Sequence, residues 1–402
     1  MNDDDGVPPS ERHWATRIGK SVLVLAPHVV ALARLEDLLP LLEADHRVQR
    51  VFTVPQDGED RPDAGELVRQ RGEVLLTPQQ AGQTTHGLVL AGSNRGLDAV
   101  RGPALFVPHG GGLGQYRSGE HITGLDPAQL MSAGRVRPDR IVLTHVRELD
   151  LLAELCPQAV PHAVVAGDIA FDRLVASAPF RDHYRRELRV TDDREIILVV
   201  VTWSPRSGFG IDPGLFRDIV DAAPGARVVA SLHPQIWSQH GIGQVLGWLS
   251  DAIEAGLVVL APHSDWRGAV VAADFVMADY TSVGAFAAGS GAPVLRIPHA
   301  PQPLVEGSPT AVLAEHAPLW DRRRPLLPQL EAAREAQCHG LGADIAGLLT
   351  SRPGQAGKIL RKEMYRLLGL SEPARAVPVS PAPLPRRTTW PVIPVPRSRP
   401  HG

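Results

Sequence analysis

Four short segments of the chain combine residues that could do chemistry with glycines or hydroxyls. They are His109-Gly110-Gly111-Gly112, Thr202-Trp203-Ser204-Pro205-Arg206-Ser207-Gly208, His233-Pro234 and Asp279-Tyr280-Thr281-Ser282. Glycines let a backbone approach a ligand closely, imidazoles exchange protons near neutral pH, and hydroxyls beside a guanidinium suit phosphate oxygens. Each segment also has a purely structural explanation: a glycine turn, a solvated loop, a half-buried histidine and a helix cap.

The segment 276–298, VMADYTSVGAFAAGSGAPVLRIP, poses this choice most clearly. Thr281 and Ser282 are expected near the start of a helix that is rich in Gly and Ala. A helix N-terminus attracts anions through its free N–H groups and its dipole. Asp279 and the two hydroxyls therefore either cap this helix or take part in binding phosphate. On the second interpretation, the small residues leave room for the backbone and a ligand to meet.

All four segments follow apolar runs that show no alternation with polar residues. Such runs, separated by helical patterns, are typical of strands buried on both faces of a parallel sheet. Ligands of these sheets bind beyond the carboxyl ends of the strands, which is where the four segments lie. The expected strands are 21–27, 47–55, 87–92, 104–110, 140–145, 162–168, 196–203, 226–234, 256–262, 274–280 and 292–298.

The strand pattern restarts near residue 190, which predicts an α/β protein with two Rossmann-like domains. The expected parts are a polar leader (1–20), an N-terminal domain (21–190), a C-terminal domain (191–370) and a tail (371–402). A helix over about 355–370 is expected to end the second domain. The tail holds nine prolines, five arginines and one acidic residue, a composition that predicts disorder.

Composition and charge narrow the class of protein. The 402 residues are 44% hydrophobic and carry a formal net charge of −3, so no nucleic acid partner is expected. Cys156 and Cys338 form no disulfide or zinc pattern, which fits a reducing cytosol. The acidic start is unlike a signal peptide, and no apolar run approaches the ~20 residues of a membrane span. We therefore expect a cytoplasmic protein, with contact to the inner face of the membrane left open.

Standard nucleotide and catalytic motifs are missing. GGGLG (110–114) is not GxGxxG, and GQAGKI (354–359) lacks features of a P-loop. The sequence has no HExxH and no GxSxG. Dehydrogenase, kinase, zinc-protease and hydrolase interpretations are therefore disfavoured, and neither a cofactor nor a metal is expected. The sequence gives no indication of the oligomeric state.

Five stretches, in their order along the chain, resemble the signature of the CDP-glycerol glycerophosphotransferase family of teichoic-acid polymerases and primases. They are FVPHGGG (106–112), VVAGDIAFDRL (164–174), ILVVVTWSPRSG (197–208), SLHP (231–234) and ADYTSV (278–283). The resemblance covers about residues 100–300. It implies a GT-B-like architecture, in which an acceptor domain and a nucleotide-donor domain face a central cleft.

The resemblance also implies roles for individual residues. His109 becomes the candidate general base and His233 a partner of the donor phosphates, while Gly110 and Gly111 allow close backbone approach. Asp172 matches an aspartate for which we expect a structural role. The candidates for donor and phosphate binding are Thr281, Ser282, Asp279, Thr202, Arg206 and Ser207.

The implied function is transfer of a glycerol-phosphate or glycosyl group from a nucleotide-activated donor to a hydroxyl of a polyol or saccharide acceptor. Two alternatives remain open: a nucleotide-sugar 2-epimerase, which should show additional carboxylates in the cleft, and a nucleotide-binding protein with a decayed site. The second is motivated by Phe286, which stands where the family pattern has an acid. The lysine that often follows the HG motif is also missing, although Arg117 could replace its charge.

Overall fold

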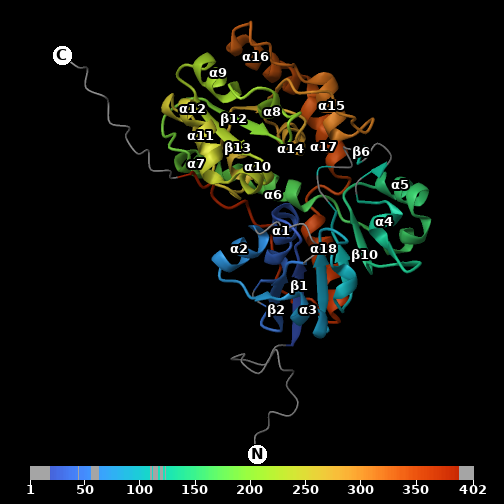
Figure 1. The fold of residues 1–402 in the computed structure, drawn as a ribbon. Helices are drawn as coiled ribbons and strands as arrows, with labels where there is room; N and C mark the ends of the chain where they lie inside the picture. Colours follow the sequence, from blue (N-terminus) through green and yellow to red (C-terminus); the bar gives the residue numbers. More distant parts are fainter. Residues whose placement is uncertain are drawn as a thin grey trace, which may run out of the picture.

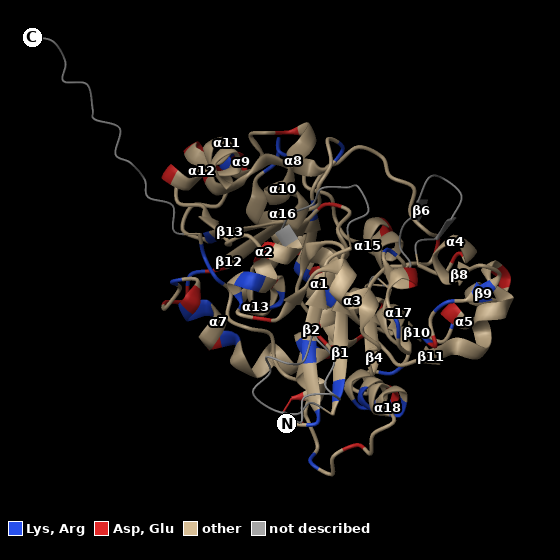
Figure 2. Ribbon diagram, turned by 60° about the horizontal axis from the view of Figure 1, so that its bottom comes forward, with Lys and Arg blue, Asp and Glu red and all other residues tan. Residues whose placement is uncertain are grey.

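The computed structural model describes residues 19–43, 45–55, 63–108, 111, 116–117, 121–122 and 124–388, and the description below is confined to them. Two α/β lobes are visible in Figure 1, one on each side of helices α1 and α6. Each lobe is built on a parallel sheet. Lys and Arg are interspersed with Asp and Glu over the helices of both lobes (Figure 2).

The first sheet has, in the described part of the chain, seven parallel strands in the order β11-β10-β5-β4-β1-β2-β3. The strands are β1 (Lys20–Leu25), β2 (Val48–Thr53), β3 (Leu75–Leu76), β4 (Leu88–Ala91), β5 (Ala104–Phe106), β10 (Arg140–Leu143) and β11 (Ala163–Val165). Its helices are α1 (Val29–Glu36), α2 (Asp63–Gln70), α3 (Pro78–Gln83), α4 (Pro127–Leu130) and α5 (Glu148–Leu155). Two short hairpins pair β6 (Tyr116–Arg117) with β7 (His121–Ile122) and β8 (Met131–Ser132) with β9 (Arg135–Val136).

The second sheet has five parallel strands, again counted over the described residues, in the order β14-β13-β12-β15-β16. The strands are β12 (Ile196–Val201), β13 (Arg227–Leu232), β14 (Val258–Val259), β15 (Phe275–Ala278) and β16 (Val294–Arg296). The helices are α7 (Arg181–Glu187), α8 (Gly208–Ile211), α9 (Leu215–Ala222), α10 (Pro234–His240), α11 (Ile242–Trp248), α12 (Ser250–Glu254), α13 (Trp266–Ala272), α14 (Ser282–Gly289), α15 (Pro309–His316), α16 (Leu326–Ala336) and α17 (Gly342–Leu349).

The central strand β12 shows why the apolar runs form buried strands. Ile196, Leu198 and Val200 belong to the core on one face of the sheet. The intervening residues of the same strand pack into the core on the other face. Because both faces are covered by helices, no position along the strand can be polar. Every run predicted to be a strand overlaps one, so the α/β prediction is confirmed.

The chain crosses between the lobes at places that differ from the predicted boundaries. Helix α18 (Ala356–Leu368), expected to end the second domain, packs in the core of the first with Leu360 and Met364 fully buried. In Figure 1 it lies beside β1 and α3. Conversely, α6 (Ile169–Ser177) and α7 place Phe171, Leu174 and Tyr184 in the core of the second domain. The first domain is therefore discontinuous in sequence.

The tail prediction needs a correction. Residues 371–388 are ordered and follow the surface of both domains, held by hydrogen bonds that include Tyr184 Oη donating to Ala382 O at 2.7 Å. Composition alone could not reveal partners such as Tyr184, which lies far away in the sequence. Residues 389–402, as well as the leader up to residue 18, lie outside the described residues.

Candidate active site

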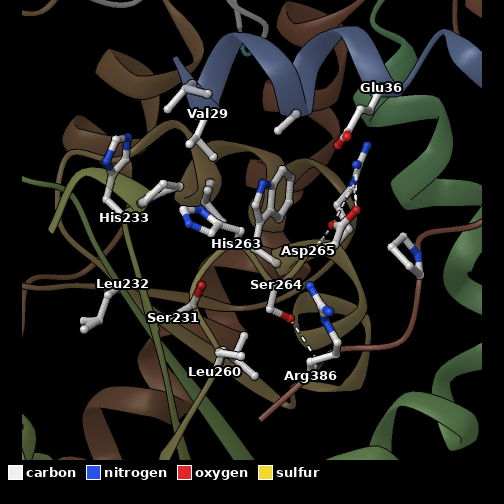
Figure 3. A pocket seen from close by; sticks show the side chains of 18 of the residues that line it. Val29, Glu36, Ser231, Leu232, His233, Leu260, His263, Ser264, Asp265 and Arg386 are labelled. Carbon is white, nitrogen blue, oxygen red and sulfur yellow. Dashed lines mark hydrogen bonds and ion pairs between the residues drawn. The ribbon is translucent and has the colours of Figure 1, made fainter. Parts of the chain in front are cut away.

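A cavity of about 570 Å³ lies between the two domains. One wall is α1 of the first domain, with Val29, Ala33 and Glu36. The opposite wall consists of the carboxyl ends of β13 and β14 and the N-termini of α13 and α14. Parallel sheets bind ligands at this edge. Figure 3 shows the side chains of His233, His263 and Val29 around this space.

Two predicted residues, Thr281 and Ser282, line the cavity at the start of α14. Thr281 is the N-cap, and its Oγ1 accepts a hydrogen bond from Val283 N at 3.3 Å. The Ser282 hydroxyl has no hydrogen-bond partner among the described residues. The helix N–H groups and dipole make this end of the cavity favourable for an anion. Thr281 therefore caps the helix, while Ser282 offers a hydroxyl to the cavity.

The small residues of α14 serve protein packing rather than ligand access. A Cβ on Gly284 would lie 3.0 Å from Ala278 Cβ, and a Cβ on Gly289 would lie 2.8 Å from Leu349 Cδ1. The helix thus sits tightly on β15 and against α17. The expectation that Gly and Ala leave room for a ligand is wrong at these two glycines, because their open sides face neighbouring elements.

The buried carboxylate of Asp279 fixes the backbone of the loops that surround the cavity. Its carboxylate accepts hydrogen bonds from the backbone N–H groups of Thr202, Gly208 and Thr281 at 3.1–3.3 Å. Only 3% of the residue is exposed, and burial raises its pKa to about 6 despite these three donors. Asp279 does not line the cavity. Its carboxylate instead fixes the backbone from which Thr202 and Thr281 extend.

Arg206 and Ser207, predicted to contact donor phosphates, point elsewhere. The Arg206 guanidinium donates to Pro301 O. The Ser207 hydroxyl donates to Ser204 O and accepts from Gly210 N at 3.0 Å, which caps the short helix α8. Neither residue lines the cavity, and Thr202 does not line it either. The loop after β12 thus uses most of its polar groups on its own conformation.

His233 lies at the carboxyl end of β13 and faces the cavity (Figure 3). Its Nδ1 accepts a hydrogen bond from Gln235 N at 3.1 Å. The neutral ring therefore carries its proton on Nε2 and can donate from there. The Trp203 ring lies beside it, with 6.4 Å between the centroids, and is 46% exposed. A donor at this position suits an oxyanion such as a phosphate.

His109 and Gly110 lie outside the described residues, whereas their neighbour Gly111 is described. Gly111 N donates to Asp168 Oδ2 at 3.1 Å, and the residue has a φ of +89° that suits glycine. A Cβ there would lie 3.0 Å from Ser282 Cβ. The backbone at Gly111 is thus packed against the start of α14, across the domain boundary.

Phe286 fills the space behind this contact. Its ring lies 5.4 Å from that of Trp266 and 6.3 Å from that of Phe171, and the residue is 4% exposed. A Cβ on Gly111 would come within 3.1 Å of the Phe286 ring. The position where the family pattern has an acid is therefore part of an aromatic cluster of α6, α13 and α14.

Two aspartates near the glycine motif, Asp168 and Asp172, bind distant parts of the chain. Asp168 is fully buried. Its carboxylate caps α6 and accepts a hydrogen bond from Arg34 Nη1 at 3.1 Å. Asp172 accepts hydrogen bonds from Gly354 N and Ala356 N at 2.8 and 2.9 Å, which anchors the start of α18. Asp172 has the geometry of a structural residue, as the sequence suggested.

A buried ion-pair network that sequence reasoning missed lines the cavity between the domains. Asp37, after α1, pairs with Arg173 of α6 and with Arg267 Nη2 of α13 at 2.8 Å. Asp265 pairs with the same Arg267 atom at 2.7 Å. Although burial raises the pKa of Asp37, the nearby Arg267 and Arg173 hold it below its usual value. No local pattern marks these residues, because they come from three distant segments.

Comparison with known proteins finds similarity in structure but not in sequence. No protein-family model matches it, and no curated protein matches its sequence. Among solved structures, a variant of the wall teichoic acid polymerase TagF with CDPG covers 88% of this chain and 90% of its own, with a TM-score of 0.61 and 10% identity. Another TagF variant aligns over the same shares with a TM-score of 0.57 and 11% identity. The S. aureus MnaA–UDP structure covers 89% of this chain and 99% of its own, with a TM-score of 0.51 and 13% identity.

The chain has a GT-B-like fold. The cavity lies between its two domains, where the sequence predicted a cleft. Within the described residues, no group of three or more His, Cys, Asp or Glu side chains is arranged to hold a metal ion. No helix in the same part of the chain is long and apolar enough to cross a membrane.

Proposed function

We propose that this protein transfers a glycerol-phosphate or glycosyl group from a nucleotide-activated donor to a hydroxyl of a polyol or saccharide. The observation that carries the proposal is the interdomain cavity, where the N-terminus of α14, Ser282 and His233 converge on one ligand-sized space. The likeness of the fold to TagF supports it.

In the proposed reaction the donor's phosphates lie against Ser282 and the first N–H groups of α14. The acceptor O–H gives its proton to the imidazole of His109, and the oxygen forms a new bond to phosphorus or to an anomeric carbon. The bond from that centre to the nucleotide's oxygen breaks, and CMP or a nucleoside diphosphate leaves. Negative charge grows on the leaving phosphate, where the helix dipole and the Nε2–H of His233 stabilise it.

The carboxylates of the cavity disfavour the 2-epimerase alternative. An epimerase needs carboxylates that are available to exchange protons. Glu36, Asp37 and Asp265 do line the cavity. However, Glu36 pairs with Arg71, and the two aspartates pair with Arg267. Each of these three acids is therefore held by an arginine, and Asp37 also joins the two domains.

Nucleotide binding is the first test of the proposed function. Thermal stability would be measured with CMP, CDP-glycerol, UDP, UDP-sugars and GDP-sugars, and any stabilising compound would enter a nucleotide-release assay. Binding stabilises the folded chain by mass action, so a donor should raise Tm. If none of these compounds raises Tm, the proposal is wrong. A cytidine ligand favours polyol-phosphate transfer, and a uridine or guanosine ligand favours sugar transfer.

The base assignment has its own test. His109→Ala should abolish nucleotide release in the presence of acceptor while leaving the Kd of the donor nearly unchanged, because a general base acts only on the acceptor. His316→Ala, an exposed histidine of the second domain, is the matched control. Full activity of His109→Ala would contradict the assignment and would leave the nucleotide-binding result standing.

A further inference from the structure

The proline-rich segment after α18 is an ordered element that spans both domains. Residues 371–388 begin against the first domain, where Arg361 Nη1 donates to Arg375 O at 3.0 Å. They then cross α6, where Arg173 Nε donates to Ser380 O at 3.0 Å. Side chains of folded helices thus bind the backbone of the segment and set its path.

The end of the segment joins the second sheet. Ala261 N donates to Arg386 O at 2.7 Å, and Thr388 N donates to Val259 O at 2.9 Å. Leu260 and Arg387 form an antiparallel bridge between these bonds. The segment therefore covers the edge strand β14, which otherwise ends the sheet. An edge covered in this way fixes the backbone position of Arg386.

The same residues form part of the cavity wall. Pro383, Leu384 and Arg386 line the cavity. Arg386 N donates to Ser264 Oγ at 2.9 Å, so the segment also braces the loop between β14 and α13. In Figure 3 Arg386 and Ser264 lie side by side, below Asp265.

The segment lies at the opposite end of the cavity from the α14 N-terminus. In the sheet order β14-β13-β12-β15-β16, α14 follows β15, whereas the loop of Ser264 follows β14. Three strand spacings of about 4.8 Å separate these strands, or about 14 Å. If phosphates occupy the α14 end, as the proposed function requires, the nucleoside lies toward Ser264 and Arg386.

Charge pairing leaves Arg386 as a group available to a ligand. The other arginines that line the cavity, Arg71, Arg173 and Arg267, each pair with a carboxylate. Arg386 has no carboxylate partner within ion-pair distance among the described residues. Its guanidinium offers donors to the carbonyl oxygens of a nucleobase or to ribose hydroxyls.

We propose that residues 380–388 form the wall of the nucleoside end of the cavity and that Arg386 contacts the nucleoside of the donor. This inference rests on the proposed function, because it assumes a nucleotide in the cavity. It assigns donor recognition to a segment that follows both domains in the sequence and is anchored to both.

Point variants test the contact of Arg386. The Kd of the tightest-binding nucleoside diphosphate among CDP, UDP and GDP would be measured by calorimetry. Arg386→Ala should raise it about tenfold, the loss of one charge-assisted hydrogen bond. Arg387→Ala is the matched control, because Arg387 Nε donates to Glu187 O and its side chain does not line the cavity. Its Kd should stay close to that of the unaltered protein.

Inorganic pyrophosphate distinguishes the nucleoside from the phosphates. Arg386→Ala should leave the Kd of pyrophosphate unchanged, whereas Ser282→Ala should raise it. An equal loss for pyrophosphate and nucleotide in Arg386→Ala would overturn the assignment to the nucleoside end. An unchanged nucleotide Kd in that variant would overturn the inference altogether, while the proposed function stands. Failure of the unaltered protein to bind any nucleotide would instead refute the proposed function.

Two shortened chains test whether residues 380–388 form a wall of the cavity. A chain ending at Thr388 keeps the segment and should bind nucleotide as the full chain does. A chain ending at Val379 lacks residues 380–388 and should bind at least tenfold more weakly, since it loses both the wall and the hydrogen bond of Arg386 N to Ser264. Equal affinities of the two chains would contradict the proposed wall. If the shorter chain melts without cooperativity, the nucleotide Kd values of Arg386→Ala and Arg387→Ala decide whether the inference holds.

Discussion

At the residue scale, the two hydroxyls at the start of α14 have different roles: one caps the helix and the other faces the cavity. Thr281 Oγ1 satisfies one N–H of the first helical turn. Ser282, one residue later, lines the cavity and bonds to no described residue. The sequence presented capping and phosphate binding as alternatives. The geometry allows both, one for each hydroxyl.

This division predicts different effects of two similar substitutions. Thr281→Ala should lower the free energy of unfolding by about 1 kcal/mol, the usual cost of losing an N-cap. Ser282→Ala should leave that free energy nearly unchanged and raise the nucleotide Kd about tenfold. Denaturant unfolding and calorimetry measure the two quantities. Ser290→Ala, at the other end of α14, is the control for binding. Equal effects of both variants on both quantities would contradict the division.

Asp279 is a second residue whose position defines its behaviour. Its carboxylate is buried below the cavity and has only backbone donors for partners. Burial raises its pKa from 3.8 to about 6. The folded chain therefore binds the Asp279 proton more tightly than the unfolded chain does. Folding is favoured while the group is protonated, and this contribution is lost as the pH rises from 3.8 through about 6.

The pH dependence of stability checks this shift. Asp279→Asn carries no charge at any pH, so subtracting its unfolding free energy from that of the unaltered protein isolates the titration of Asp279. The difference should fall by at most about 3 kcal/mol between pH 4 and pH 7. Denaturant unfolding at several pH values measures it. A difference that stays constant, or that rises with pH, would show that the pKa of Asp279 is not raised.

At the element scale, helices from both domains line one side of the cleft and are joined there by ion pairs. The end of α1 brings Asp37 to Arg173 of α6 and Arg267 of α13. Asp37 is 4% exposed. A buried charge of this kind is stabilised by its partners, and removing one member leaves the others unpaired away from water.

Asp37→Ala is therefore expected to destabilise the protein by about 3–5 kcal/mol. The control is Asp321→Ala, which removes a carboxylate whose partner Arg323 is 89% exposed; an exposed pair contributes about 0–1 kcal/mol. Both values come from denaturant unfolding of the full chain. A loss of unfolding free energy below 1 kcal/mol for Asp37→Ala would mean that the network does not stabilise the contact between the domains.

At the scale of the whole molecule, the first domain is completed by residues from near the C-terminus. Leu360, Met364 and Leu368 of α18 pack with β1 and β4 in one core. Asp172 anchors the start of this helix through two backbone N–H groups. A piece of chain that stops before α18 therefore leaves an apolar face of the first sheet exposed.

Fragments make this discontinuity measurable. A chain of residues 19–177 alone should fail to show a cooperative thermal transition, because the core lacks α18. The same chain joined by a flexible linker to residues 351–370 should regain one. Circular dichroism on heating distinguishes the two. A cooperative transition in the shorter fragment would contradict the role assigned to α18.

The sequence by itself determined the layered α/β fold and the edge at which the site lies. Residues 196–201 are apolar at every position, as a strand covered on both faces requires. The hydroxyls and the HP pair that follow such runs reach the cavity because parallel strands end at a common edge. Local physics suffices for these inferences, since each depends on residues that are near one another in the chain.

Only the tertiary structure decided which polar groups remain available in the cleft. Arg206 and Ser207 have the composition of a phosphate loop, yet Pro301 O and the backbone of their own loop hold them. Asp37, Arg267 and Arg386 carry no local motif and still line the cavity. Residues 371–388 show the same limit, because their order depends on partners such as Tyr184, Ser177 and Ala261. Such pairings span one hundred residues or more, and chain composition holds no record of them.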